Sequence, residues 1–125
     1  MHFATSVVNA ALTSTLAVGR WVGLSLTLPA DDASSGVTEP VGGSYIRVFL
    51  AGTDWSAAAD RQVESAVDVN FPTATADWGV AVAYVLFTAS SGDTAIGAGR
   101  LGAGHDIPIG AQATLPAGSI HAEAP

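Results

Sequence analysis

Apolar and polar residues alternate along several short segments of the chain, with the period of two that is typical of half-buried β-strands. In residues 63–71 the odd-numbered positions are mostly apolar and the even-numbered positions are mostly polar. In residues 21–28 the even-numbered positions are all aliphatic, so we expect that side of a first strand to face the core. Residues 80–88 are apolar on both sides, which predicts a central strand that is covered on both faces. These patterns predict a protein that is organised by β-sheet.

Turn-forming residues separate the other expected strands. Further short strands are predicted at residues 44–51, 95–101, 107–115 and 119–122. Residues 29–43 are rich in Gly, Pro, Ser and Asp, which predicts a long surface loop. A series of short strands joined by turns favours an all-β fold, a small antiparallel β-sandwich that is jelly-roll-like. A partly open barrel is the alternative.

The N-terminal segment carries a different pattern. Its apolar residues near one helical face are Val7, Val8, Ala11, Leu12 and Leu16. Thr5 or Ser6 could cap the start of a helix, and Gly19 could end it. We therefore expect residues 1–18 to be a short helix or an arm, and residues 19–125 to be a single β-sandwich domain. Because the segment lacks a basic start and is interrupted by hydroxyl residues, we expect a soluble protein without a signal peptide or a membrane span.

The chain carries few charged residues, and most of them are acidic. Of the 125 residues, 49% are hydrophobic and 12% are charged, with eleven acids, four arginines and no lysine, for a net charge of −7. The arginines are isolated in sequence, which argues against a nucleic-acid partner, since phosphate binding requires clustered cations. A surface rich in Ala, Thr, Ser and Gly suits contact with other protein subunits, so we expect a homo-oligomer. The chain has no Cys, so no disulfide is available.

Two short motifs could indicate a nucleotide-binding or catalytic site, and neither is a strong indication. Residues 97–102 fit the pattern G-x-G-x-x-G, but the residues that follow cannot begin the helix that a dinucleotide site requires, so flexible β-turns explain the glycines better. His105 and Asp106 could be an imidazole and its orienting carboxylate. Because no G-x-S-x-G motif occurs, we interpret them as a polar turn. We therefore expect no catalytic residue and no cofactor.

Metal binding is not expected either. The histidines His2, His105 and His121 are too scattered for a zinc site. The acidic pair at residues 31–32, with Glu39 in the same loop, lacks the spacing of a calcium loop, and a solvated acidic turn is the simpler interpretation.

Trp55 lies in a loop rich in Gly and Ala, without a periodic partner. An aromatic residue in such a place is either a lid over the core or an anchor in a subunit contact, and the sequence leaves both open. The candidate interface therefore consists of Val7, Val8, Leu12, Leu16 and Trp55.

Four strings of the sequence resemble those of a known family. They are Trp-Val-Gly-Leu-Ser-Leu at 21–26, the acidic loop at 31–39, Gly-Gly-Ser-Tyr at 42–45, and Asn-Phe-Pro-Thr-Ala-Thr-Ala-Asp-Trp-Gly at 70–79. The resemblance, over roughly residues 9–120, is to small bacteriophage virion proteins that are described as tail fibre, minor capsid or capsid decoration proteins. The last string is the most specific.

This resemblance implies a β-rich virion component without catalytic activity. Together with the low, acidic charge, it favours a capsid decoration protein on the head exterior, which would bind the major capsid protein and itself, as a homotrimer. No nucleic acid or membrane partner is expected. A tail-associated structural or fibre protein is the alternative. A second alternative is a carbohydrate-binding module, in which Trp21, Trp55, Trp78 or Tyr45 would stack on sugar rings.

Overall fold

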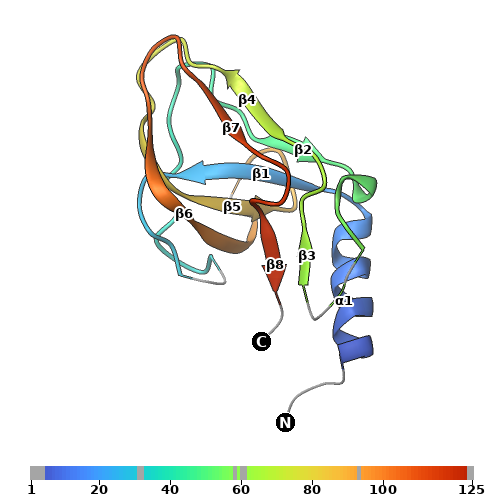
Figure 1. Cartoon of the computed structure of the whole chain (residues 1–125). Helices are drawn as coiled ribbons and strands as arrows, with labels where there is room; N and C mark the ends of the chain where they lie inside the picture. Colours follow the sequence, from blue (N-terminus) through green and yellow to red (C-terminus); the bar gives the residue numbers. More distant parts are fainter. Residues whose placement is uncertain (1–4, 31–32, 58, 60–61, 93, 124–125) are drawn as a thin grey trace.

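Antiparallel β-strands make up most of the regular secondary structure of the chain (Figure 1). The computed structural model describes residues 5–30, 33–57, 59, 62–92 and 94–123. Within these ranges the chain forms one α-helix, one short 3₁₀ helix and eight strands. Every pair of neighbouring strands is antiparallel. The all-β class predicted from the sequence is therefore confirmed.

The largest sheet has four strands, in the order β2-β1-β5-β6. These strands are β1 (Arg20–Ser25), β2 (Val48–Leu50), β5 (Gly79–Phe87) and β6 (Ala95–Ile107). Strand β5 lies between β1 and β6, and its residues from position 83 to 87 are all buried. The prediction that this doubly apolar segment forms a central strand is confirmed.

Two smaller sheets complete the fold. Strand β3 (Gln62–Glu64) pairs with β8 (His121–Glu123), and β4 (Val69–Thr73) pairs with β7 (Gln112–Leu115). Figure 1 shows β4 and β7 on one side of the large sheet and the β3–β8 pair pointing away beside the helix.

The main core lies between the large sheet and the β4–β7 pair. It contains Val22 and Leu24 from β1, Leu86 from β5, Phe71 from β4 and Leu115 from β7, all of them buried. The even-numbered side of β1 therefore faces the core, as its alternation predicted, although the strand ends at Ser25 instead of residue 28.

A second, smaller cluster lies on the opposite face of the large sheet. Val85 and Phe87 of β5 contact Ala33 there, and Trp21 and Val37 pack against them. Because Ala33 and Val37 belong to the segment after β1, this long loop covers the outer face of the sheet. The loop predicted from its turn residues is thus a packed layer of the structure.

Helix α1 (Thr5–Ala17) packs beside β3 and the 3₁₀ helix η1 (Gly52–Asp54). Gly19 follows the helix with a φ of 79°, and its N–H donates to the carbonyl of Leu16 at 3.0 Å. A glycine in the left-handed region is the common way to end a helix, because it carries no Cβ. The N-terminal segment is therefore helical over its described length.

The prediction of one strand at residues 63–71 is wrong, because that segment is divided between two sheets. The burial pattern is as expected for Val63, Ser65 and Phe71, whereas Val67 is 37% exposed. Between the strands, the carboxylate of Asp68 accepts a hydrogen bond from Ala117 N at 2.8 Å. The alternation indicates which side chains are buried, and does not indicate which strand each residue pairs with.

The prediction of flexible turns at residues 97–102 is also wrong, because these residues lie inside β6. In the register, Ala83 pairs with Arg100 while Ala81 pairs with His105, so residues 101–104 form a bulge opposite a single residue of β5. The ring of Tyr84 covers the backbone of its cross-strand partner Gly99, where a side chain would clash. Gly99 therefore serves the close packing of this edge strand, whereas a Cβ at Gly97 or Gly102 would meet no atom within 4 Å.

Candidate functional site

A pocket of about 540 Å³ lies between α1, η1 and the start of β3. Its described lining residues are Thr13, Leu16, Ala17, Ala51, Gly52, Thr53, Trp55, Ser56, Ala57 and Val63. None of these carries a charge, and most are small or apolar.

The loop on one side of the pocket is held in place by local hydrogen bonds. The carboxylate of Asp54 accepts from Ala51 N at 2.9 Å, and Asp54 N donates to Ala51 O at 2.9 Å. After the loop, Ser56 N donates to Glu64 O at 2.8 Å, and Glu64 N donates to the Ser56 hydroxyl at 3.0 Å. These bonds attach the loop to the edge of β3 and fix the position of Trp55 between them.

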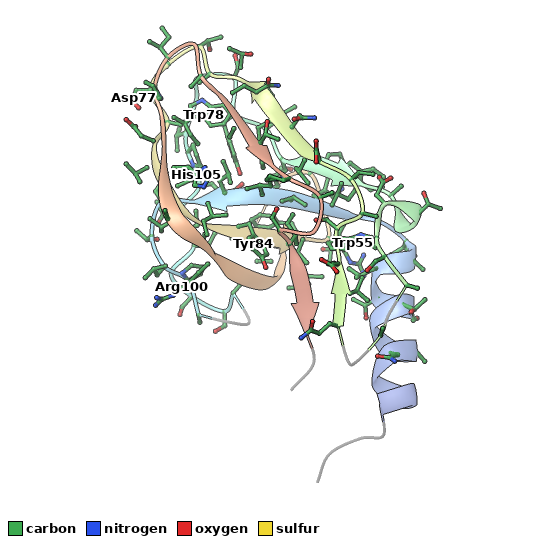
Figure 2. All side chains as sticks on the ribbon, in the orientation of Figure 1. Trp55, Asp77, Trp78, Tyr84, Arg100 and His105 are labelled. Atoms are coloured by element: carbon green, nitrogen blue, oxygen red, sulfur yellow. The ribbon has the colours of Figure 1, made fainter. Side chains whose placement is uncertain are left out.

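Trp55 covers the core from this loop. Its side chain is 8% exposed and belongs to the main core cluster, and Figure 2 shows it between β3 and α1. Its indole Nε1 is buried and has no hydrogen-bond partner among the described residues. A buried donor without a partner costs about 1–3 kcal/mol. Trp55 is therefore a lid over the core.

The sequence-based interface stays a prediction, and the structure places two of its five residues. Leu16 is 3% exposed, and it lines the same pocket as Trp55. The side chains of Val7, Val8 and Leu12 lie outside the described residues. Leu16 and Trp55 are thus brought together, as buried walls of a pocket and not as exposed anchors. No periodic signal marks the small pocket residues, which is why the sequence did not indicate them.

Beside the large sheet lies the only ion pair within the described residues. Arg47 Nη2 donates to Glu39 Oε1 at 2.6 Å, and Arg47 Nε donates to Glu39 Oε2 at 3.0 Å. The Tyr45 hydroxyl also donates to Glu39 Oε2, at 2.5 Å, and accepts from Leu24 N at 3.0 Å. Asp31 and Asp32 lie outside the described residues. For Glu39 the prediction of a solvated acidic turn is wrong, since its carboxylate holds Arg47 and Tyr45.

Arg47 is 7% exposed and reaches beyond Glu39 to the turn between β5 and β6. It donates to the carbonyls of Ala89 at 3.0 Å and Gly92 at 2.7 Å, and its guanidinium lies 3.4 Å from the ring centroid of Phe87. This cluster of Glu39, Tyr45 and Arg47 attaches the long loop to the sheet. The predicted strand at 44–51 is reduced to β2, and beyond its pairing with β1 the Tyr45 hydroxyl accepts a hydrogen bond from Leu24 N.

The tyrosine of this cluster predicts a pH dependence of stability. Burial, and then the hydrogen bond to Glu39, raises the pKa of Tyr45 above its usual value. Above about pH 10 an unfolded tyrosine loses its proton while folded Tyr45 keeps it, so stability falls as pH rises, by about 1.4 kcal/mol per pH unit. We expect urea denaturation between about pH 10 and 11.5 to show a steeper loss of stability for the wild type than for Tyr45→Phe. Equal slopes would contradict this assignment.

The residues considered for catalysis do not converge. His105 and Asp106 are consecutive residues of β6, both exposed, so their side chains point to opposite faces of the strand. Their interpretation as a polar turn is therefore wrong, and an oriented imidazole is not formed by this pair. His2 and the side chain of His121 lie outside the described residues. Among the described residues, no three His, Asp or Glu side chains gather to hold a metal.

The aromatic residues considered for sugar binding do not share an exposed face. Trp55 and Trp78 are 8% and 4% exposed, and Trp78 Nε1 donates to Gly43 O at 2.8 Å. Trp21 is half-buried and packs on Phe49, with ring centroids 5.1 Å apart. Tyr45 packs edge-on against Trp78, at 5.3 Å between ring centroids. These rings are structural.

The described residues form a small antiparallel β-protein with an apolar pocket and no assembled reactive cluster, and their one α-helix is too short to cross a membrane. The chain belongs to the family described as podophage GP4 fiber I protein gp80, whose sequence pattern matches residues 2–123. No curated protein matches the chain. The chain is therefore a bacteriophage virion structural protein, as the resemblance of its sequence implied.

Proposed function

We propose that this chain is a non-catalytic structural subunit of a virion fibre. The observation that carries the proposal is the match of residues 2–123 to a family of fibre proteins. The separation of His105 from Asp106 onto opposite faces of β6 supports a role without catalysis. Such a subunit acts by burying surface against its neighbours, and many copies or contacts turn a modest contact into a stable assembly.

The proposed partners are other copies of the chain and the adjoining virion proteins. The low charge of the chain supports protein contacts, since charged residues are depleted at interface centres. The net charge of −7 without any lysine supports a position away from packaged DNA, because like charges repel. We expect the subunit to need neither a cofactor nor a metal.

Decoration of the capsid exterior is the second candidate function. The acidic net charge supports an exterior position on the head as much as a position in a fibre. In this role the chain would bind the major capsid protein, as a homotrimer. The description of the family as a fibre protein is the reason for preferring the fibre.

The copy number and the location of the protein in purified phage distinguish the two candidates. We expect quantitative mass spectrometry, normalised to the major capsid protein, to find a small number of copies per particle. Gold-labelled antibody should mark fibres in electron micrographs. Hundreds of copies with label spread over the head would overturn the fibre proposal in favour of decoration. Absence from washed particles would overturn both.

A further inference from the structure

Strand β6 is a free edge of the large sheet. It pairs with β5 on one side, and within the described parts of the chain no strand pairs with its other side. Residues 102–106 are all exposed, so no described segment of the subunit covers this part of the edge. An uncovered edge strand presents a row of backbone donors and acceptors with which another strand can pair.

The bulge of β6 adds to these free backbone groups. Residues 101–104 have no partner in the register with β5, because Val82 alone lies between the paired positions Ala81 and Ala83. These residues nevertheless remain part of the extended strand. Their N–H and C=O groups are therefore left over from the ladder with β5, and backbone groups of this kind are strong hydrogen-bonding partners for a second strand.

Two residues of opposite charge flank the bulge. Arg100 and Asp106 are both exposed, and neither forms an ion pair or a hydrogen bond with another described residue. Their neighbours Leu101 and Ile107 pack in or against the main core. Because successive side chains of a strand point to opposite faces, Arg100 and Asp106 both point to the outer face of the sheet. They lie at equal distances in sequence from Ala103, one on each side.

We propose that two copies of this chain associate by antiparallel pairing of their β6 strands about a two-fold axis at Ala103. In this register Arg100 of each copy lies opposite Asp106 of the other copy, on the same face, so the contact contains the same ion pair twice. Parallel pairing in register would place arginine beside arginine. Both copies use the same surface, so the contact is isologous and closes as a dimer. The inference rests on the proposed function as a structural subunit, and it names the partner and the surface.

The residues between the two charges leave room for the contact. In the proposed register Gly102 of one copy lies opposite Gly104 of the other, on the face that carries the ion pairs. A Cβ at Gly102 would meet no atom of its own subunit within 4 Å, so this position is open on the outer face. For a chain with a net charge of −7, most pairs of identical surfaces would repel. The β6 edge is self-complementary, because the two-fold axis brings opposite charges together.

Charge reversals at the two positions test the inference. Arg100→Asp and Asp106→Arg each replace both attractive pairs of the dimer with like charges. We expect wild-type protein to dimerise reversibly in sedimentation velocity at low salt, and each variant alone to associate at least about tenfold more weakly. The double variant that carries both substitutions restores opposite charges and should dimerise like the wild type. Wild-type protein that stays monomeric at every concentration, or single variants that dimerise like it, would overturn the inference.

Mixtures of the variants test the register. Arg100→Asp mixed with Asp106→Arg should form a mixed dimer, because one copy then has two acids at these positions and the other has two arginines. Wild type mixed with the double variant should form no mixed dimer, because the antiparallel register then opposes like charges. Parallel pairing predicts the reverse for this second mixture. A first mixture without dimers, or a second mixture with them, would contradict the antiparallel register.

A control position on the same strand separates the contact from general effects of charge. Ile96→Asp and Ile96→Arg place either charge at an exposed position of β6 outside the paired segment, and both should dimerise like the wild type. Circular dichroism verifies the fold of each variant. Should a charge reversal unfold the chain, Arg100→Gln or Asp106→Asn replaces it, and the neutral variant should also weaken the dimer.

This test uses purified protein, whereas the proposed function is tested by location in the phage. Label on the fibres, with an association that ignores the charge reversals, would overturn the β6 contact alone. A dimer that follows the charge reversals, from a protein that is spread over the head, would overturn the fibre proposal and leave the contact standing.

Discussion

Replacement of Arg47 with methionine is expected to lower the free energy of unfolding by about 3–5 kcal/mol, the usual cost of removing one partner of a buried ion pair. The substitution leaves the Glu39 carboxylate without its two guanidinium bonds, and the carbonyls of Ala89 and Gly92 without their donor. It also removes the cation from the face of Phe87. Since small domains have a total stability of about 5–15 kcal/mol, the variant should be marginal at 37 °C.

Chemical denaturation of a set of variants tests this prediction. Arg100→Met removes an exposed arginine of β6 and should change stability by no more than about 0.5 kcal/mol. Arg47→Lys should lower the stability nearly as much as Arg47→Met, because an ammonium group cannot form the bidentate hydrogen bonds of the guanidinium to the Glu39 carboxylate. In the double variant Glu39→Gln with Arg47→Met, the unpaired charge is gone, so stability should partly return. A loss below about 1 kcal/mol for Arg47→Met would show that the cluster is dispensable.

The sequence predicted the parts of this fold that depend on burial alone. The doubly apolar segment that became β5 lies at the centre of its sheet, and the aliphatic side of β1 faces the core. Apolar periodicity indicates directly which side chains are buried, so these predictions did not depend on which strands pair with each other. The all-β class was predicted from the same apolar periodicity.

Predictions that depended on pairing or on single polar contacts were wrong. The alternation at 63–71 continues across a change of partner from β8 to β7, and the period of two is the same on both sides of that change. Arg47 and Glu39 look like ordinary surface charges in sequence, because their pairing joins positions eight residues apart through a folded loop. The glycines of β6 resemble a turn motif unless the ring of Tyr84 over Gly99 is known.

The candidate site was anticipated only through its two largest side chains. Leu16 stood out by helical periodicity and Trp55 by its isolation, and both line the pocket. The remaining walls are small residues, which carry no pattern in sequence. Their role arises because α1, η1 and β3 meet there, with a close backbone approach between η1 and the end of α1.

This close approach is at Gly52, and it leads to the second large expected effect. A Cβ at position 52 would overlap the backbone carbonyl of Ala17, at the end of α1. A side chain could rotate away from such an overlap, whereas the main chain of a helix cannot, so α1 must move away from η1. We expect Gly52→Ala to lower the free energy of unfolding by at least about 2 kcal/mol, within the range for overpacked sites.

Two measurements distinguish this local displacement from a general loss of stability. Hydrogen exchange should quicken most in α1 and η1, since these elements lose their contact while the β1–β5–β6 core remains. Gly102→Ala is the matched control, because a Cβ there meets no atom within 4 Å, and it should be close to neutral. If Gly52→Ala were as stable as Gly102→Ala, the helix could not be held against η1 in the way described.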